Sequence, residues 1–362
     1  MRESSSVVRP EPMGSATYSE SSRLQAAGLQ QAIAIFARVA AAVPLPRPPQ
    51  PIVIADYGAS TGHNSLLPIG AAIAAVRERT RPEHAVLVAH TDLPENDFTV
   101  LFRTLAEDPE SYLLRDRASF TSAIGRSFYS QILPSNTVNL GWSSWATQWL
   151  SRVPTQIPDH LAVAYSADDA ARSAFARQAA NDWQHFVAFR ARELSPEGRV
   201  VVLTMAVDED RQFAFRPLLD GIRSVLRDLT RDGLLHEHET RRMAIPVVGR
   251  SEKDLRAPFS PSGRFEGLVV EQLEVFNAED RFWTQFCADR DAATFGAQWA
   301  AFARFSIFPT LVAALDGGAK DPRAEEFTEQ LEAGVAELLS AAPERLQIPL
   351  ATVVLVKRGC SD

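Results

Sequence analysis

The chain has 362 residues, of which 46% are hydrophobic and 23% are charged, a composition typical of an ordinary globular protein with one or two domains. Lysine and arginine total 37 against 45 aspartate and glutamate residues, giving a formal net charge of -8. An acidic chain without a basic cluster lacks the surface that phosphate backbones and anionic lipids require, so we expect neither nucleic acid nor a membrane as a partner.

The cysteines and the N-terminal residues bear on the cellular compartment. Cys287 and Cys360 are the two cysteines, and they form no metal-ligand spacing. Two thiols in a chain of this length favour a reducing compartment over a disulfide framework. Residues 1–20 lack the apolar core of a signal peptide, and no apolar run reaches membrane-spanning length. We therefore expect a cytoplasmic protein.

Helical and strand patterns alternate along most of the chain. After a polar tail at residues 1–12, apolar residues recur at helical spacing over 24–43, and the run PLPRPPQP ends that helix. The apolar strand PIVIADYG at 51–58 precedes an alanine-rich helix over 64–78. The further elements predicted in this way are a strand at 84–90, a helix at 96–108, and strands at 137–142, 199–207 and 348–358.

This alternation predicts an α/β fold with a doubly wound parallel sheet. Between 208 and 323 the strand rhythm weakens, and aromatic-rich helical patterns predict a mostly helical cap. We expect residues 1–50 to form a segment and helix that fold over the site, and 51–207 with 324–362 to form the core. The helix at 325–340 has Phe327, Leu331, Val335 and Leu338 on one stripe, which predicts a helix that flanks the sheet.

The strongest local motif is DYGASTG at 56–62, which lies between a predicted buried strand and a helix. Glycines at this place permit a tight turn and a close approach of ligand to backbone, and the helix N-terminus favours an anionic group. The D-x-G-x-x-x-G spacing differs from the dinucleotide fingerprint and from a phosphate-binding loop. It resembles motif I of S-adenosylmethionine-dependent methyltransferases.

The next strand ends in an acidic residue, Asp92, about thirty residues beyond the glycine turn. A carboxylate at such a strand end can accept hydrogen bonds from both ribose hydroxyls of a nucleoside. The alternative is a cap of a turn or helix, because Pro94 and Asn96 favour a turn at this point. Either role is compatible with the sequence.

The stretch SSWATQWLSRVP at 143–154 has Trp145, Gln148 and Trp149 at spacings of three and four, which predicts one face of a helix. Aromatic residues at this spacing usually pack in a core. Indole and amide N–H groups are also donors that can orient a carboxylate between aromatic faces.

Five longer motifs follow one another in order: YSESSRLQ, IADYGASTGHNS, TDLPENDFTVLFRTL, SFYSQILPSNTVNLGWSSWATQWLSRVP and GRVVVLTMAV. Across nearly the whole chain they resemble the successive motifs of the SABATH family of plant-type carboxyl methyltransferases. The resemblance implies a Rossmann-like class I methyltransferase sheet with an inserted, mostly helical cap. It also implies S-adenosylmethionine as the cofactor, S-adenosylhomocysteine as the product, and a small carboxylic acid as the partner that accepts the methyl group.

The same resemblance implies roles for individual residues. Ser22 and Asp56 would hold the methionine end of the cofactor, and Asp92 with Leu93 the ribose. Ser127 and Phe128 would contact the adenine. Tyr18, Gly58 and Asn64 complete the implied cofactor-binding set.

The implied acceptor site consists of Gln25, Trp145, Gln148 and Trp149. Gln25 and Trp149 would position the acid by donating hydrogen bonds to its carboxylate. A carboxylate with a pKa of about 4 is already ionised at neutral pH, so methyl transfer needs no general base, and we expect no catalytic residue in that sense.

No metal is expected. Several plant members carry magnesium at a D-x-F-N-I-P segment, and the matching stretch here, RRMAIP at 241–246, lacks the oxygen ligands. The run HEHE at 236–239 is interpreted as a solvated polar surface, and His90 as a histidine that stands alone, with no nucleophile motif.

Two alternatives to carboxyl methylation stay open at the level of sequence. One is transfer to a nitrogen or hydroxyl of a heteroaromatic or polar metabolite, for which a hydroxyl acceptor would need a base. The other is a protein that binds the cofactor without turnover. The resemblance also implies a homodimer.

Overall fold

The computed structural model describes the backbone of residues 16–208 and 213–359, and the side chains of residues 29–208 and 213–359. The polar tail predicted at 1–12 lies outside the described residues. Among the helices that the structure describes, none combines the length and the apolar character needed to cross a bilayer.

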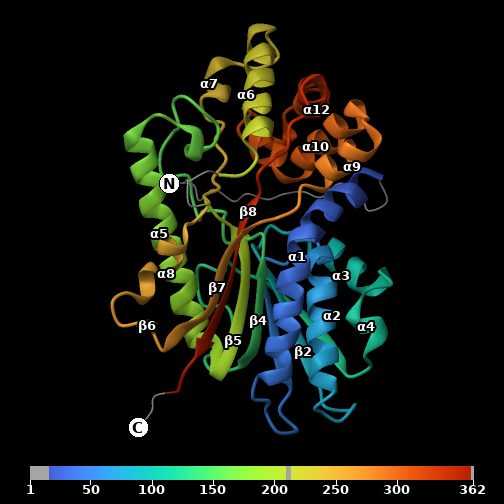
Figure 1. Cartoon of the computed structure of the whole chain (residues 1–362), viewed down its shortest axis with the longest axis vertical. Coiled ribbons are helices and arrows are strands. Elements are labelled where there is room, and N and C mark those ends of the chain that lie inside the picture. The colour runs from blue at the N-terminus through green and yellow to red at the C-terminus, as the bar shows by residue number, and fades with distance from the viewer. Residues whose placement is uncertain (1–15, 209–212, 360–362) are drawn as a thin grey trace.

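The described residues form one sheet of eight strands in the order β3-β2-β1-β4-β5-β8-β7-β6 (Figure 1). Strands β1 to β5 are parallel, β8 is antiparallel to both β5 and β7, and β6 is antiparallel to β7. The strands are β1 (Ile52–Tyr57), β2 (Val86–Asp92), β3 (Ser119–Gly125), β4 (Val138–Ser144), β5 (Leu194–Met205), β6 (Arg264–Phe265), β7 (Leu268–Asn277) and β8 (Pro349–Lys357).

Helices cover both faces of the sheet and one of its ends. In Figure 1, α1 to α4 lie on one side of the sheet and α5 on the other, while α6, α7, α9, α10 and α12 lie beyond the carboxyl ends of the parallel strands. The longer helices are α1 (Ala16–Ala42), α2 (His63–Arg77), α3 (Phe98–Glu107), α5 (Asp169–Glu193), α6 (Arg216–Arg231), α9 (Arg281–Asp289), α10 (Ala292–Ser306) and α12 (Ala324–Ala341). The shorter helices are α4 (Tyr112–Arg115), α7 (Glu237–Thr240), α8 (Glu252–Arg256) and α11 (Phe308–Val312).

The central strands are apolar because both of their faces are covered. Every residue of β4 is buried, and so are eight of the nine residues of β8. One apolar cluster packs α1 and α2 against one face of the sheet, while Trp183, Phe186 and Val187 of α5 pack against the other face. Such two-sided burial is why the sequence shows continuous apolar runs here and not alternating ones. The prediction of an α/β fold is confirmed.

Three strands were not predicted, namely β3, β6 and β7. Strand β7 lies inside the 208–323 range, where the sequence predicts mostly helix, yet it joins the sheet beside β8. Its ten residues are mostly half-buried or exposed, and only Leu268 is buried. Because the strand lies near the edge of the sheet, polar residues such as Glu271 and Glu274 interrupt its apolar pattern. A weakly covered strand therefore lacks the continuous apolar run that marks the central ones.

The stripe on α12 also differs from the prediction. Phe327, Leu331, Val335 and Leu339 are its buried residues, whereas Leu338 is 42% exposed. The buried set has a spacing of four throughout, so its members line one face of the helix. The helix packs against α10 and α6 and so belongs to the helical layer beyond the strand ends.

Candidate active site

Two loops that carry predicted site residues leave the sheet at the same point. The strand order reverses between β1 and β4, which are adjacent and parallel. Gly58 follows β1, and Trp145 follows β4. In doubly wound sheets, ligands bind in the crevice outside the carboxyl ends of the strands at such a reversal. The topology therefore places the glycine turn and the tryptophan-rich stretch at one site.

The glycine turn requires a glycine at position 58. Gly58 has a φ of 88°, and a Cβ atom added to it would lie 2.4 Å from the Cβ of Ala146 and 3.5 Å from Cε1 of Phe128. The amides of Gly58 and Ala59 both donate to the carbonyl of Thr91, at 2.9 and 3.0 Å. The bare backbone of this turn thus forms a cradle between β1 and the loop that follows β4.

Asp92 ties the end of β2 to the same turn. Its Oδ2 accepts a hydrogen bond from the Ser60 amide at 2.7 Å, and its Oδ1 accepts one from the Leu93 amide at 2.7 Å. Burial raises the pKa of Asp92, while these two amides act to lower it. The cap of the following helix is Asp97 and not Asp92. The remaining lone pairs of the Asp92 carboxylate suit the hydroxyls of a ribose.

Asp56 lies at the end of β1 and is buried together with two partners that the sequence did not suggest. Its Oδ2 is 2.7 Å from Nδ1 of His90, and Nε2 of His90 is 2.9 Å from the Tyr112 hydroxyl. His90 was interpreted as lacking a partner, which is wrong because the parallel register of β1 and β2 places it opposite Asp56. The chain of contacts fixes one oxygen of the carboxylate.

The segment after β3 brings predicted adenine residues close to the glycine turn. The Phe128 ring lies beside Gly58, and Ser127 Oγ accepts a hydrogen bond from the Tyr129 amide at 3.2 Å. The hydroxyl of Tyr129 donates to the carbonyl of Trp149 at 2.6 Å. Sequence reasoning missed Tyr129, which directly joins the predicted cofactor segment to the predicted acceptor segment.

The stretch that follows β4 is not a helix. Trp145 has a φ of 56°, in the left-handed region, and residues 146–150 form a turn and an isolated bridge between Trp149 and Val247. The Trp145 amide donates to the carbonyl of Leu203 on β5 at 3.0 Å. These long-range contacts override the helical spacing of the three side chains.

The side chains of this turn differ in their surroundings. Gln148 is buried, its Nε2 donates to the Trp145 carbonyl at 2.7 Å, and its Oε1 accepts from the Thr204 hydroxyl at 3.3 Å. The buried Nε1 of Trp145 has no hydrogen-bond partner among the described side chains and backbone. An indole N–H in this state is a donor that a bound acceptor group can use.

The remaining predicted site residues belong to helices α1 and α2. Tyr18, Ser22 and Gln25 belong to α1, but their side chains lie outside the described residues. Helix α1 packs beside α2 and reaches α10 of the helical layer. Asn64 is in the first turn of α2, directly after the glycine turn.

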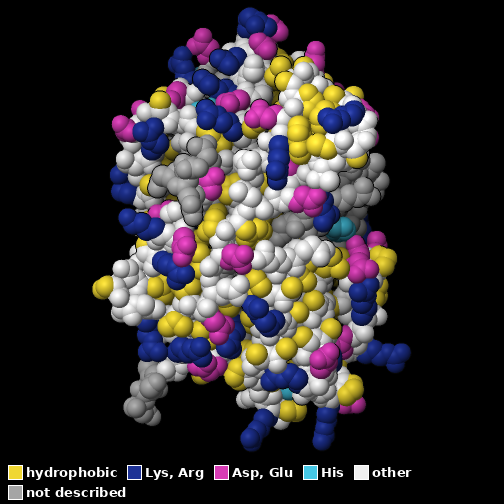
Figure 2. All heavy atoms as spheres, in the orientation of Figure 1, with side chains coloured by type: hydrophobic (Ala, Val, Ile, Leu, Met, Phe, Trp, Pro, Cys, Tyr) yellow, Lys and Arg dark blue, Asp and Glu magenta, His cyan; other side chains and the backbone are white. Residues whose placement is uncertain are grey.

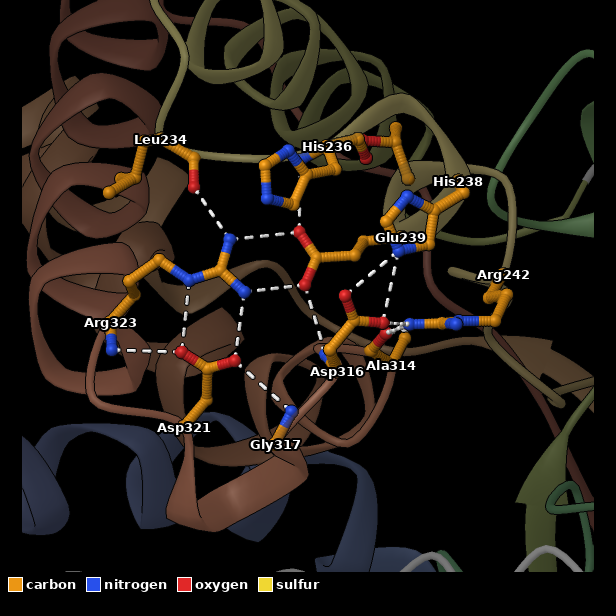
Figure 3. Close-up of polar contacts among 11 residues, drawn as sticks. Leu234, His236, His238, Glu239, Arg242, Ala314, Asp316, Gly317, Asp321 and Arg323 are labelled. Carbon is orange, nitrogen blue, oxygen red and sulfur yellow. Dashed lines mark hydrogen bonds and ion pairs between the residues drawn. The ribbon is translucent and has the colours of Figure 1, made fainter.

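The HEHE run is not simply a solvated surface. Glu239 is fully buried, and its two carboxylate oxygens accept hydrogen bonds from the Arg323 guanidinium at 2.6 and 3.0 Å (Figure 3). Ligand atoms of His238, Glu239 and Asp316 lie within 4.8 Å of one another. Asp316 contacts Arg242 at 2.7 Å and His238 at 2.9 Å, so arginine side chains already neutralise both carboxylates. This set is an ion-pair network. The sequence around 236–239 does not indicate it, because Arg323 lies 84 residues away from Glu239 along the chain.

The chain matches the family model described as SAM dependent carboxyl methyltransferase over residues 6–358. It is 28% identical over 252 residues to the salicylate carboxymethyltransferase of Clarkia breweri, covering 66% of this chain and 67% of that protein. It is 27% identical over 275 residues to a salicylate/benzoate carboxyl methyltransferase of Arabidopsis thaliana, covering 72% of this chain and 71% of that protein.

A solved structure of loganic acid methyltransferase with SAH has the same fold. It superposes with a TM-score of 0.72 and 21% identity, covering 97% of this chain and 99% of that chain. The predictions of the family, of the class I fold and of S-adenosylmethionine as cofactor are confirmed. The chain belongs to the SAM-dependent carboxyl methyltransferase family, and it transfers methyl from S-adenosylmethionine to the carboxylate of a small organic acid.

Proposed function

We propose that this methyltransferase acts on a small aromatic or apolar acid, which it holds beside the cofactor at the carboxyl ends of β1 and β4. The observation that carries the proposal is the contact between Gly58 and Ala146, next to the unpartnered buried N–H of Trp145. An indole donor and aromatic surface for the acid would then lie directly beside the proposed cradle for the cofactor.

The residues at the reversal of strand order between β1 and β4 fit S-adenosylmethionine. The backbone turn at Gly58 packs closely against Ala146, and Asp56 and Ser22 would contact the amino acid group of the methionine end. Asp92 and Leu93 would hold the ribose, and Phe128 with Ser127 the adenine. When bound, the cofactor supplies an activated methyl group on its sulfonium.

The acceptor site would combine donors with aromatic walls. Gln25, Trp149 and Trp145 would donate hydrogen bonds to the acid or line its ring. We assign Gln148 a supporting role, because both ends of its amide are engaged and it holds the carbonyl of Trp145. A change at Gln148 would then act on the acid through the orientation of Trp145.

Placement would be the main contribution of the protein to the rate. A carboxylate is ionised at neutral pH, so the protein needs only to align its oxygen with the methyl carbon and sulfur, at about 3 Å, and to exclude water. Donors that hold one carboxylate oxygen leave the other free to attack. This division of roles requires rigid support for Trp145 and Trp149.

Two further proposals rest on the sequence patterns, and a third, the homodimer, rests on the family resemblance. The helical residues of 208–323, with the N-terminal segment 1–50, form a cap that sets the choice of acid over a core of 51–207 and 324–362. The enzyme works as a homodimer, which size-exclusion chromatography with light scattering tests. It is located in the cytoplasm, a proposal that rests on its two cysteines and that fractionation tests.

The activity test uses methyl-labelled S-adenosylmethionine with a panel of aromatic, apolar and polar carboxylic acids. We expect label to pass into the organic extract with aromatic or apolar acids and to be released by mild alkali, because methyl esters hydrolyse. A Trp149→Phe variant should keep cofactor affinity and raise the KM for the acid about tenfold. Turnover of polar acids alone, or an unchanged KM in this variant, would contradict the proposal.

A further inference from the structure

Residues 126–137, between β3 and β4, form neither helix nor strand, so their backbone polar groups need partners from elsewhere. Four of these backbone groups form hydrogen bonds with two side chains in the last turn of α5, Arg190 and Glu193. Both side chains are fully buried. The segment includes Ser127 and Phe128, the proposed adenine residues.

Arg190 binds the first half of the segment. Its Nη1 donates to the Phe128 carbonyl at 2.8 Å, and its Nη2 donates to the Ser130 carbonyl at 3.0 Å. The guanidinium lies over the Tyr57 ring, with its carbon 4.1 Å from the ring centroid. A planar fork with fixed donor directions determines the position of two carbonyls at once. The backbone of Phe128 is therefore set by Arg190.

Glu193 binds the second half of the segment and connects it to β1. Its Oε1 accepts hydrogen bonds from the amides of Ile132 at 2.5 Å and Leu133 at 3.0 Å, and from Nη2 of Arg190 at 2.9 Å. Its Oε2 accepts from the Tyr57 hydroxyl at 2.7 Å. Tyr57 directly precedes Gly58, so one carboxylate holds both the loop and the strand end that form the cofactor site.

Stability alone is a weak reason for this arrangement. A buried ion pair contributes little net stability, because desolvation of two charges offsets their attraction. Its effect is geometric, since the two side chains fix four backbone groups of the loop and the Tyr57 hydroxyl of β1 relative to one another. We propose that Arg190 and Glu193 are positioning residues for the adenine end of S-adenosylmethionine. The proposal rests on the assignment of Phe128 to the adenine.

The decisive experiment measures S-adenosylhomocysteine affinity by calorimetry in the full-length protein without acid. An Arg190→Lys variant keeps the charge but loses the fork, so we expect affinity to fall at least tenfold. The KM for S-adenosylmethionine should rise by a similar factor, while kcat at saturating cofactor changes less. The matched control is Arg323→Lys, which changes an arginine of the ion-pair network in Figure 3 and should alter affinity less than twofold.

Both variants are measured at the same interval below their own melting temperatures, which removes the effect of global stability. An Arg190→Lys variant that binds as tightly as Arg323→Lys would overturn the proposal. If Arg190→Lys does not fold, Tyr57→Phe removes only the hydroxyl contact with Glu193 and should weaken binding about threefold; unchanged binding in this variant would also overturn the proposal.

Phe128→Ala separates this inference from the function on which it rests. Weaker binding in Phe128→Ala together with normal binding in Arg190→Lys would overturn the positioning role alone. Normal binding in Phe128→Ala would overturn the adenine assignment, and the positioning role with it. Weaker binding in both supports the proposal.

Discussion

Asp92, the proposed ribose ligand, carries a charge that lowers the stability of the folded protein at neutral pH. The side chain is half-buried, and this partial burial raises the pKa of the carboxyl above that of an exposed aspartate. A raised folded-state pKa means that the group favours folding at low pH and that this contribution is lost as the pH rises through the folded value. At neutral pH the ionised form therefore costs stability, and we propose that binding of the ribose hydroxyls offsets this cost.

The affinity for S-adenosylhomocysteine should depend on pH through Asp92. Because the ionised carboxylate is the form that accepts two hydroxyl hydrogen bonds, S-adenosylhomocysteine affinity should fall as the pH drops through the raised pKa, at less acidic pH than for an ordinary aspartate. Asp92→Asn should bind at least tenfold more weakly at pH 7, with a flatter pH profile, and should be no less stable than the wild type. Calorimetry between pH 4 and 8 measures this.

A parallel fall in affinity for Asp92→Asn and the wild type below pH 6 would show that another group titrates. A loss of stability in the variant at pH 7 would contradict the cost assigned to the half-buried charge.

At the scale of elements, the segment after β3 joins the proposed cofactor site to the proposed acceptor site. Tyr129 donates its hydroxyl to the Trp149 carbonyl at 2.6 Å, and Arg250 donates to the neighbouring Thr147 carbonyl at 2.6 Å. Burial raises the pKa of Tyr129, so its hydroxyl remains a donor over the whole assay range. The loop after β4 thus takes its shape from side chains on other segments.

Tyr129→Phe tests this connection. Loss of the hydroxyl should loosen the turn at Trp149 and raise the KM for the acid three- to tenfold, with little effect on S-adenosylhomocysteine affinity. The matched control is Tyr165→Phe, which removes a hydroxyl donor to the Phe213 carbonyl. Steady-state kinetics with each substrate varied in turn separates the two effects. An equal rise in the acid KM in both variants would contradict a specific link.

At the scale of the whole molecule, the helical layer is fixed by a buried carboxylate. Hydrogen bonds from Arg323 lower the pKa of Glu239 to about 2. Figure 2 shows charged side chains of both signs interspersed over the face it presents, most of which are exposed and contribute little to stability. The buried pair is different, because removing one partner leaves an uncompensated charge.

Arg323→Met should lower the free energy of unfolding at pH 7 by about 3 kcal/mol. A depressed folded-state pKa stabilises the protein above the unfolded value of about 4.5, and this contribution is lost as the pH falls toward about 2. The difference in free energy of unfolding between Arg323→Met and the wild type should therefore narrow as the pH falls from about 4.5 to about 2. Urea denaturation at several pH values measures this difference. Arg231→Met, which breaks an exposed pair with Asp228, should lower the free energy of unfolding much less than Arg323→Met at any pH.

What the sequence by itself determined is local. The order of buried strands, the glycine turn at Gly58 and the acidic residue at Asp92 were all found correctly, because each depends on neighbouring residues. Apolar runs mark two-sided burial, and a strand followed by a glycine turn and a helix is encoded within about twenty residues.

Only the tertiary structure decided how distant segments meet. Trp145 adopts a left-handed conformation because β5 and the Gln148 amide hold it, and no local pattern reports those contacts. Arg190 reaches a loop about sixty residues away, and Arg323 reaches a carboxylate 84 residues away. The spacing and polarity of residues within one segment predict only the structure of that segment. These side chains take their roles from partners that the folded sheet brings beside them.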